Sequence, residues 1–237
     1  MRKVLTFFII IILTIIQTKN SISHEINKNQ IDEIIREFII NNPNVLEKSI
    51  LNYKESKAKK KFLSILNELK KVSNPKIHHK DKNLTIYEFF DYNCGYCKTM
   101  MNRLFETYER DKNFSIVFVE LPILSQSSFD ASIAALAAHN QNRYIEYHIE
   151  LMKHQGNLNK GTLIMIAKKL NLDLKLFQDD LSNDRLRVTI NKNRKIAQKL
   201  KLRGTPAFII GKTIYPGALK KSDLLEAIKL ERINFKK

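Results

Sequence analysis

Two cysteines separated by two residues are the side chains whose type and spacing point most directly to chemistry. Cys94 and Cys97 are the two cysteines of the chain. A disulfide at this spacing closes a very small loop and constrains the unfolded chain little, so it is a poor structural crosslink. In thiol–disulfide exchange, by contrast, one thiolate attacks a disulfide and a second thiol nearby resolves the mixed disulfide that forms. The pair therefore indicates a redox centre.

The residues around the pair predict where it lies. Residues 84–90 form a short apolar run that is typical of a buried strand. From Cys97 to about residue 111, apolar side chains recur at helical spacing. A cysteine between a strand and a helix lies where backbone N–H groups and the helix dipole stabilise a thiolate. We therefore expect Cys94 to be the nucleophile and Cys97, one turn into the helix, to be the resolving thiol.

Other uses of this spacing fit less well. Attachment of c-type haem requires a histidine directly after the second cysteine, but Lys98 occupies that position. A Cys2His2 zinc site with His148 and His154 has tolerable spacing within each pair, yet the two pairs are much further apart than in a zinc finger. The remaining histidines, which we expect to be solvated or hydrogen-bonded, are His24, His78, His79 and His139. We expect no metal and no cofactor.

The pattern downstream of the pair predicts the rest of an α/β domain. Residues 114–121 form a second apolar run, so the strand–helix–strand unit should contain a parallel pair with a crossover. Residues 127–202 have only helical patterns. Two short apolar runs, 207–210 and 213–215, then predict a hairpin. A helix over residues 222–233 should close the domain.

Three stretches of the sequence belong together. They are Glu88-Phe89-Phe90-Asp91-Tyr92-Asn93-Cys94-Gly95-Tyr96-Cys97-Lys98, Ala134-Ala135-Leu136-Ala137-Ala138 and Gly204-Thr205-Pro206-Ala207-Phe208. This arrangement resembles the bacterial DsbA-like family of the thioredoxin superfamily over residues 84–233. The resemblance implies an α/β fold: a thioredoxin fold with an inserted helical domain at about residues 127–202, preceded by an N-terminal helical extension.

The resemblance also implies roles for three residues besides the cysteines. The proline that Pro206 matches is cis in this family and lies beside the active cysteines, so Thr205 before it should face the substrate. The acidic residue that Glu88 matches lies under the second cysteine. As a buried carboxyl with a raised pKa, it could relay a proton when Cys97 attacks. The expected site is therefore Cys94, Cys97, Glu88, Thr205 and Pro206.

The residues between the cysteines leave the direction of electron flow open. Strong oxidases of the family carry Pro-His there and Val before the cis-proline, whereas this chain has Gly95-Tyr96 and Thr205. Both differences resemble the periplasmic disulfide isomerases. We expect a protein-disulfide oxidoreductase that acts on thiol-containing exported proteins and is reset by a membrane redox partner. A chaperone-like binding module for unfolded exported proteins and a membrane-anchored thiol reductase are the alternatives.

The N-terminus has the layout of a secretory signal peptide. Arg2 and Lys3 precede an apolar run that ends at Ile16, and Ser21 and Ser23 place small residues before a possible cleavage site. The apolar run is shorter than the ~20 residues that a spanning helix needs, although an uncleaved anchor remains an alternative. We expect residues 1–23 to be a signal peptide and the protein to reside in the periplasm.

Residues 24–75 predict helices without a sheet of their own. Apolar side chains recur at helical spacing on both sides of a break at residues 41–44. Amphipathic helices must bury their apolar faces, either on the main domain or on another chain. The segment also resembles an extension that mediates self-association in a DsbA-like subgroup, so we expect a homo-oligomer through residues 26–72. Residues 76–83 would then be a linker to the domain at 84–237.

The charge balance is strongly basic without indicating a nucleic-acid partner. The chain has 41 Lys and Arg against 24 Asp and Glu, a formal net charge of +17. The basic residues are scattered, with no basic run interleaved with aromatic residues, and no nucleic-acid-binding motif occurs. We therefore expect no nucleic acid as a partner. A generally basic surface could favour acidic partners or an anionic membrane face.

Overall fold

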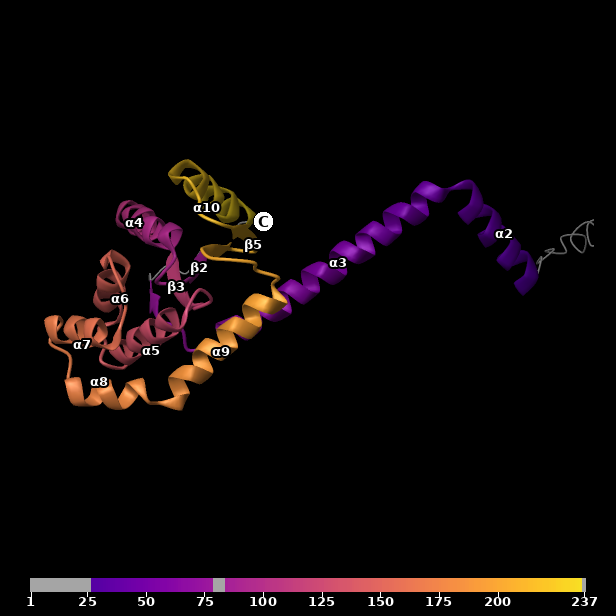
Figure 1. The fold of residues 1–237 in the computed structure, drawn as a ribbon. Coiled ribbons are helices and arrows are strands. Elements are labelled where there is room, and N and C mark those ends of the chain that lie inside the picture. Colours follow the sequence, from indigo (N-terminus) through magenta and orange to yellow (C-terminus); the bar gives the residue numbers. More distant parts are fainter. Residues whose placement is uncertain (1–26, 79–83, 236–237) are drawn as a thin grey trace, which may run out of the picture. The chain divides into compact units, whose positions relative to one another are not determined.

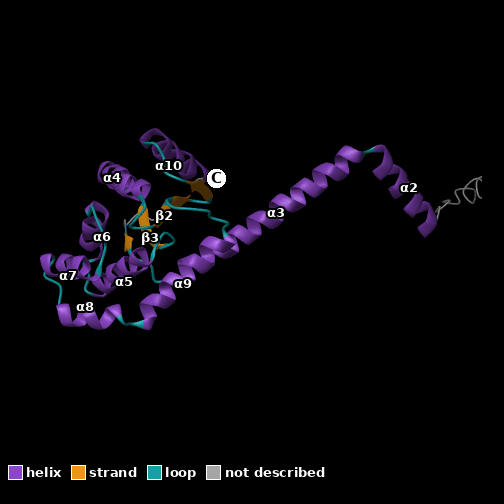
Figure 2. Cartoon of the chain, in the orientation of Figure 1, coloured by secondary structure: helices purple, strands orange, loops and turns teal. Residues whose placement is uncertain are grey.

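The computed structural model describes residues 27–78 and 84–235 of the chain, which Figure 1 draws with its helices and strands labelled. These residues divide into two units, one that ends at Lys57 and one that begins at Ala58. Most of the described residues are helical, as Figure 2 shows. The signal peptide expected at residues 1–23 lies outside the described residues.

The first unit consists of helix. Asn27 caps α2 (Lys28–Asn41): its side chain accepts a bond from the Gln30 N–H, and the Gln30 side chain accepts one from the Asn27 N–H, both at 3.0 Å. Such reciprocal bonds satisfy two N–H groups at the start of a helix. α3 (Pro43–Lys70) follows after Asn42 alone, and proline suits a first helical position because its φ is already helical. The expected break between two N-terminal helices is confirmed.

A five-stranded sheet forms the centre of the second unit. Its strands are β1 (Lys76–Ile77), β2 (Thr85–Phe90), β3 (Ser115–Glu120), β4 (Ala207–Ile210) and β5 (Thr213–Pro216). They lie in the order β1-β3-β2-β4-β5, with β2 and β3 parallel and the other neighbouring pairs antiparallel. The expected parallel pair and the C-terminal hairpin are confirmed, and the sheet is that of a thioredoxin fold.

The sheet separates two apolar cores, because side chains alternate between its faces along each strand. Ile86 and Phe90 point into the first core, whereas Tyr87 and Phe89 point into the second. The first core lies under α4 (Gly95–Arg110), α5 (Gln126–Asn140), α6 (Tyr144–Lys153), α7 (Lys160–Lys169), α8 (Leu174–Leu181) and α10 (Lys221–Phe235). The second lies under the last turns of α3 and of α9 (Asp184–Lys199). The helical insert is confirmed, and its last helix reaches the opposite face.

The junction between the N-terminal helices and the sheet differs from the expected boundaries. β1 lies within residues 76–83, the expected linker, and pairs antiparallel with β3. Three side chains of α3, Ile65, Leu66 and Leu69, are buried in the second core. Side chains that complete a core belong to its domain, so the last turns of α3 are part of the thioredoxin unit. Residues 54–61 of α3 are nearly all polar, and the apolar stripe resumes at Phe62, just before the buried residues.

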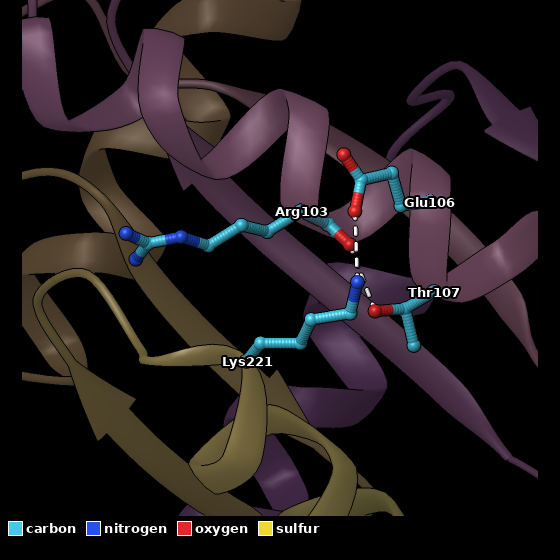
Figure 3. A network of polar contacts seen from close by, with 4 residues as sticks. All are labelled: Arg103, Glu106, Thr107 and Lys221. Carbon is cyan, nitrogen blue, oxygen red and sulfur yellow. Dashed lines mark hydrogen bonds and ion pairs between the residues drawn. The ribbon is translucent and has the colours of Figure 1, made fainter.

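A polar network joins α4 to the start of α10 (Figure 3). Lys221 Nζ lies 2.9 Å from Glu106 Oε2, and Thr107 Oγ1 donates to the Arg103 carbonyl at 2.8 Å. Arg103 Nη1 donates to the Leu219 carbonyl at 2.7 Å, just before α10. An exposed ion pair contributes little stability, so the partly buried Arg103 contact is the stronger of the links. Together they fix the helix that begins at the cysteine pair.

Candidate active site

Cys94 lies where the sequence predicted, at the junction of a strand and a helix. It is the N-cap of α4, after the short loop that follows β2. Its N–H donates to the Asp91 carbonyl and its own carbonyl accepts from the Lys98 N–H, each at 3.1 Å. The Cys94 thiol donates to the Thr205 carbonyl, with Sγ 3.2 Å from the oxygen. The sulfur therefore lies at the positive end of a helix and faces the Thr205 backbone.

Cys97 is the more buried of the two thiols. It is 0% exposed, against 8% for Cys94. Burial is the main cause that raises the pKa of the Cys97 thiol, and hydrogen bonds from the Asp91 backbone and the Thr205 side chain lower it in part. Ionisation of Cys97 therefore needs a group that accepts its proton.

The segment before β4 supplies contacts to both sulfurs. The Thr205–Pro206 peptide bond is cis, as expected. The Thr205 carbonyl accepts from Cys94, and the Thr205 side chain helps to lower the pKa of Cys97. Pro206 is buried, and its carbonyl accepts from the Gly217 N–H at 2.9 Å, which fixes this segment to the strand that follows.

The sequence reasoning missed Asp91, which organises the loop before Cys94. Asp91 is fully buried. Its Oδ1 accepts from the Asn93 N–H at 2.8 Å, and its Oδ2 accepts from the N–H groups of Ile123 and Leu124 at 2.8 and 3.0 Å. One carboxylate thus ties the cysteine loop to the loop after β3. An acidic residue three positions before a reactive cysteine was the available signal.

Asn93 adds a second tie between the same two loops. Its Nδ2 lies 2.9 Å from the hydroxyl oxygens of Ser125, Ser127 and Ser128. Ser125 is also the N-cap of α5, where its side chain accepts from the Ser128 N–H. The residue directly before Cys94 is therefore anchored to the start of a helix. This anchoring restricts the position of the sulfur.

Glu88 is buried in the sheet, as expected from its neighbours. Its exposure is 1%, and its Oε1 has no hydrogen-bond partner. Burial raises the pKa of Glu88 to about 8, with a smaller contribution from the charge of Glu120. Because Ile86 and Phe90 point into the first core, Glu88 between them points there as well. That core also contains Cys97.

Glu120, at the end of β3, is a second buried carboxyl that the sequence reasoning missed. It accepts hydrogen bonds from the hydroxyls of Tyr92, Tyr144 and Ser132. Burial raises the pKa of Glu120 to about 8, although those three bonds lower it in part. The Tyr92 hydroxyl also bonds to Nδ1 of His148 at 3.0 Å. Glutamate at the end of an apolar strand was the only signal in the sequence.

His148 lies in the core and not at a metal site. Its ring packs against aromatic rings, among them Phe90 and Phe118, each with centroids 4.9 Å away, and burial lowers the pKa of His148 to about 3. Among residues 27–78 and 84–235, no group of three or more His, Cys, Asp and Glu side chains is arranged to hold a metal ion. In the same part of the chain, no helix has the length and apolar character needed to cross a bilayer.

Apolar side chains are exposed beside the cysteine loop. Tyr96, between the two cysteines, is 72% exposed, and Ile123 and Leu124 are 44% and 56% exposed. The backbone of Ile123 and Leu124 is held by Asp91, so these side chains are presented from a fixed loop. A surface of this kind suits an extended, partly apolar polypeptide.

Comparison with known families and structures gives one consistent match. Residues 85–229 match the family described as DSBA-like thioredoxin domain. A thioredoxin-like oxidoreductase from Silicibacter pomeroyi DSS-3 is 34% identical, with a TM-score of 0.65, over 68% of this chain and 92% of its own. ScsC from Proteus mirabilis, in a compact conformation, is 27% identical, with a TM-score of 0.67, over 89% of this chain and 100% of its own.

Curated relatives add two further similarities. A probable disulfide bond formation protein D from Bacillus cereus is 23% identical over 175 residues, which cover 68% of this chain and 78% of that protein. The Na(+)/H(+) antiporter NhaA 1 from Salinispora arenicola is 28% identical over 151 residues, 63% of this chain and 23% of the antiporter. The match thus spans about a quarter of the antiporter's length.

Proposed function

Because the chain belongs to the DSBA-like thioredoxin domain family, we propose that Cys94 and Cys97 are its redox-active pair. Thr205, Pro206 and Glu88 complete the proposed catalytic site. The chain is a protein-disulfide oxidoreductase. The observation that carries the assignment to these residues is the hydrogen bond from the Cys94 thiol to the Thr205 carbonyl, directly before the cis bond to Pro206.

The proposed exchange proceeds through Cys94. When the pair is oxidised, a client thiolate attacks Cys94 Sγ, the Cys94–Cys97 bond breaks, and Cys97 leaves as a thiolate that takes up a proton. A second client thiolate then attacks the client sulfur of the mixed disulfide and releases the Cys94 thiolate. The client loses two electrons and the pair gains them. In the reverse direction, the Cys94 thiolate attacks a client disulfide and Cys97 resolves the adduct.

Glu88 is proposed to carry the proton that Cys97 gains or loses. A carboxyl with a pKa of about 8 is mostly protonated at neutral pH and can still give up its proton nearby. Cys97 needs such a partner because burial raises its own pKa. Glu88 and Cys97 face the same core. Transfer of the proton from Glu88 to the Cys97 thiolate moves the negative charge from the sulfur to the carboxylate, and the reverse transfer returns it.

We propose isomerisation as the preferred direction. Gly95-Tyr96 and Thr205 replace the residues of the strong oxidases, and the Thr205 side chain reaches Cys97. A hydrogen bond to the resolving thiol favours its ionisation, and so favours resolution of mixed disulfides over their accumulation. This is what repeated rearrangement of a client requires.

We further propose that residues 26–72 join two or more chains. Helix α2 has no buried residue, and its apolar side chains are between 42% and 68% exposed. These side chains are Ile31, Ile34, Ile35, Phe38, Ile39 and Ile40. Val45, Leu46, Ile50 and Leu51 of α3 are also exposed. Apolar area of this extent is a candidate for burial between chains.

Export to the periplasm through residues 1–23, and action on thiol-containing exported proteins, complete the proposal. A membrane redox partner would reset the pair after each cycle. The exposed side chains of Tyr96, Ile123 and Leu124 support contact with unfolded or partly folded clients. The basic net charge of +17 favours acidic segments of such clients.

The direct test is turnover of a substrate with scrambled disulfides. Wild-type protein should restore native pairing, and Cys94→Ser should not. Both proteins should suppress aggregation of a cysteine-free unfolded client to the same extent, which controls for binding. If Cys94→Ser retained full turnover, the chain would act as a chaperone-like binding module and the proposed redox role would be wrong.

A further inference from the structure

Glu120 is a buried carboxyl for which the exchange reaction has no direct use. Tyr92 and Tyr144 donate their hydroxyls to its Oε1 at 3.0 and 2.7 Å, and Ser132 donates to its Oε2 at 2.8 Å. The donors come from the loop after β2, from α6 and from α5. Three O–H donors stabilise the ionised form of a carboxyl group. The three donors thus offset part of the effect of burial, which raises the pKa of Glu120.

Glu88 has the opposite surroundings on the same face of the sheet. In the parallel register, Glu120 pairs with Phe90, and Glu88 lies two residues earlier on that neighbouring strand. Glu88 and Phe90 point to the same side, so both carboxyl groups face the first core. Glu88 Oε1 has no hydrogen-bond partner, although the residue is buried. An ionised Glu88 would therefore lack the hydrogen-bond donors that stabilise an ionised Glu120.

We propose that Glu120 is a positioning residue of the redox centre, whose carboxylate keeps the proton on Glu88. Two ionised carboxylates in the same apolar core repel each other and lose their hydration. One of the two groups therefore stays protonated. Burial raises the pKa of both groups to about 8, and the three donors, which Glu88 Oε1 lacks, favour ionisation of Glu120 before Glu88. Glu88 is then ready to protonate Cys97 when it leaves. This inference deepens the proposed role of Glu88 and rests on it.

The other groups around the two carboxyls do not disturb this arrangement. On the neighbouring strands, Glu88 is flanked by Phe118 and Phe208, which carry no charge. Helix α4 brings the Cys97 thiol to this core, and α10 contributes the apolar side chains of Leu224, Ala227 and Ile228. Tyr92 from the loop is kept neutral, because burial raises its pKa well above the usual value.

Three titratable groups remain near Glu120: His148, Tyr144 and Asp91. Burial lowers the pKa of His148 to about 3, so it is neutral, and burial raises that of Tyr144. The Asp91 carboxylate raises the pKa of Glu120, but it is bonded to three backbone N–H groups of the loops. In agreement with the proposal, the charge of Glu120 is itself a cause that raises the pKa of Glu88.

The experiment follows both carboxyl groups directly. The full-length reduced protein is labelled with [δ-13C]glutamate and titrated by NMR, with signals assigned from Glu88→Gln and Glu120→Gln. In the wild type, the coupled pair should titrate in two steps. In Glu120→Gln, the remaining Glu88 step should fall by about one pH unit below the upper step of the wild type. Glu88→Gln should leave the lower step, that of Glu120, close to its wild-type position, because Glu88 is still neutral when Glu120 ionises.

Two further variants separate charge from packing. Ser132→Ala removes one donor of Glu120 and leaves the charge, so it should move the lower step, that of Glu120, to higher pH. Glu231→Gln alters another buried carboxyl, bonded to the Lys212 N–H, and should leave both steps unchanged. An unchanged Glu88 midpoint in Glu120→Gln would overturn the proposal. If that variant did not fold, a lower step that stayed in place or fell in Ser132→Ala would do so.

The proposed role of Glu88 is tested by kinetics, separately from the NMR titration. Glu88→Gln should change the pH profile of mixed-disulfide resolution by Cys97. If it does not, Glu88 is not the proton carrier, and the claim that Glu120 serves the redox centre is overturned with it. Glu88→Gln could change the pH profile of resolution while Glu120→Gln leaves the NMR midpoint of Glu88 unchanged. In that case only the proposed role of Glu120 is wrong.

Discussion

Replacing Glu88 by glutamine should make the reduced protein more stable at neutral and alkaline pH. In the folded state burial raises the pKa of Glu88 from its ordinary value of 4.5 to about 8. The protonated side chain is thus favoured by folding, and the stability it allows is fully present below pH 4.5. That stability is lost as the pH rises towards 8 and changes no further above it. Glutamine keeps the shape and cannot ionise.

The size of the effect follows from the same two values. Each pH unit between them corresponds to about 1.4 kcal/mol. At pH 7 the wild type should therefore have lost about 3 kcal/mol relative to Glu88→Gln, and above pH 8 at most about 5 kcal/mol. A single-domain protein has a total stability of roughly 5–15 kcal/mol, so the difference is large enough to measure.

The assay is urea unfolding of the reduced wild type and of Glu88→Gln at intervals from pH 4 to pH 9. The variable to compare is the difference in free energy of unfolding between the two proteins. That difference should be constant up to about pH 4.5 and should then grow in favour of the variant. Glu231→Gln, also at a buried carboxyl, is the matched control. Two parallel stability curves across this range would refute a buried, neutral Glu88.

Three further predictions concern the sulfurs and the N-terminal helices. Cys97→Ala should trap mixed disulfides with clients on non-reducing gels, whereas Cys94→Ala should trap few; equal trapping would contradict the assigned order of attack. Thr205→Val should slow resolution by Cys97 about fivefold, the value of one hydrogen bond of about 1 kcal/mol, and Thr205→Ser should restore it. Deleting residues 24–57 should leave a redox-active monomer by light scattering, whereas deleting 24–75 should also lower stability, because it removes buried turns of α3. A monomeric full-length protein at tens of micromolar would remove the basis for self-association.

The cysteine pair and its surroundings could be predicted because their signals are local. Cys94 and Cys97 are two residues apart, and the apolar run before them and the helical pattern after them fix the junction. The strands and the helical insert were likewise visible as runs and periodicities. β1 was not, because a strand of two residues carries no pattern and exists only through its pairing with β3.

The setting of Glu120 could not be predicted, because its partners come from separate parts of the chain. Tyr92, Ser132 and Tyr144 lie in a loop and two helices. Each looks unremarkable in its own segment, and no spacing connects them. The fold alone brings three hydroxyls to one carboxylate. The same holds for Asp91, two of whose three backbone partners lie more than thirty residues downstream.

The distribution of carboxyl groups over the sheet argues that they serve the sulfurs. Burying a carboxyl costs stability, and an apolar residue of similar size would avoid that cost. On the face of β2, β3 and β4 towards the second core, the strand residues are aromatic, aliphatic or hydroxyl-bearing, without a carboxyl group. Glu88 and Glu120 both face the first core, which contains Cys97. The loss of stability from buried carboxyls is therefore confined to the face of the sheet where the buried Cys97 thiol must exchange a proton. Titratable groups with strongly shifted pKa values are expected at a catalytic site.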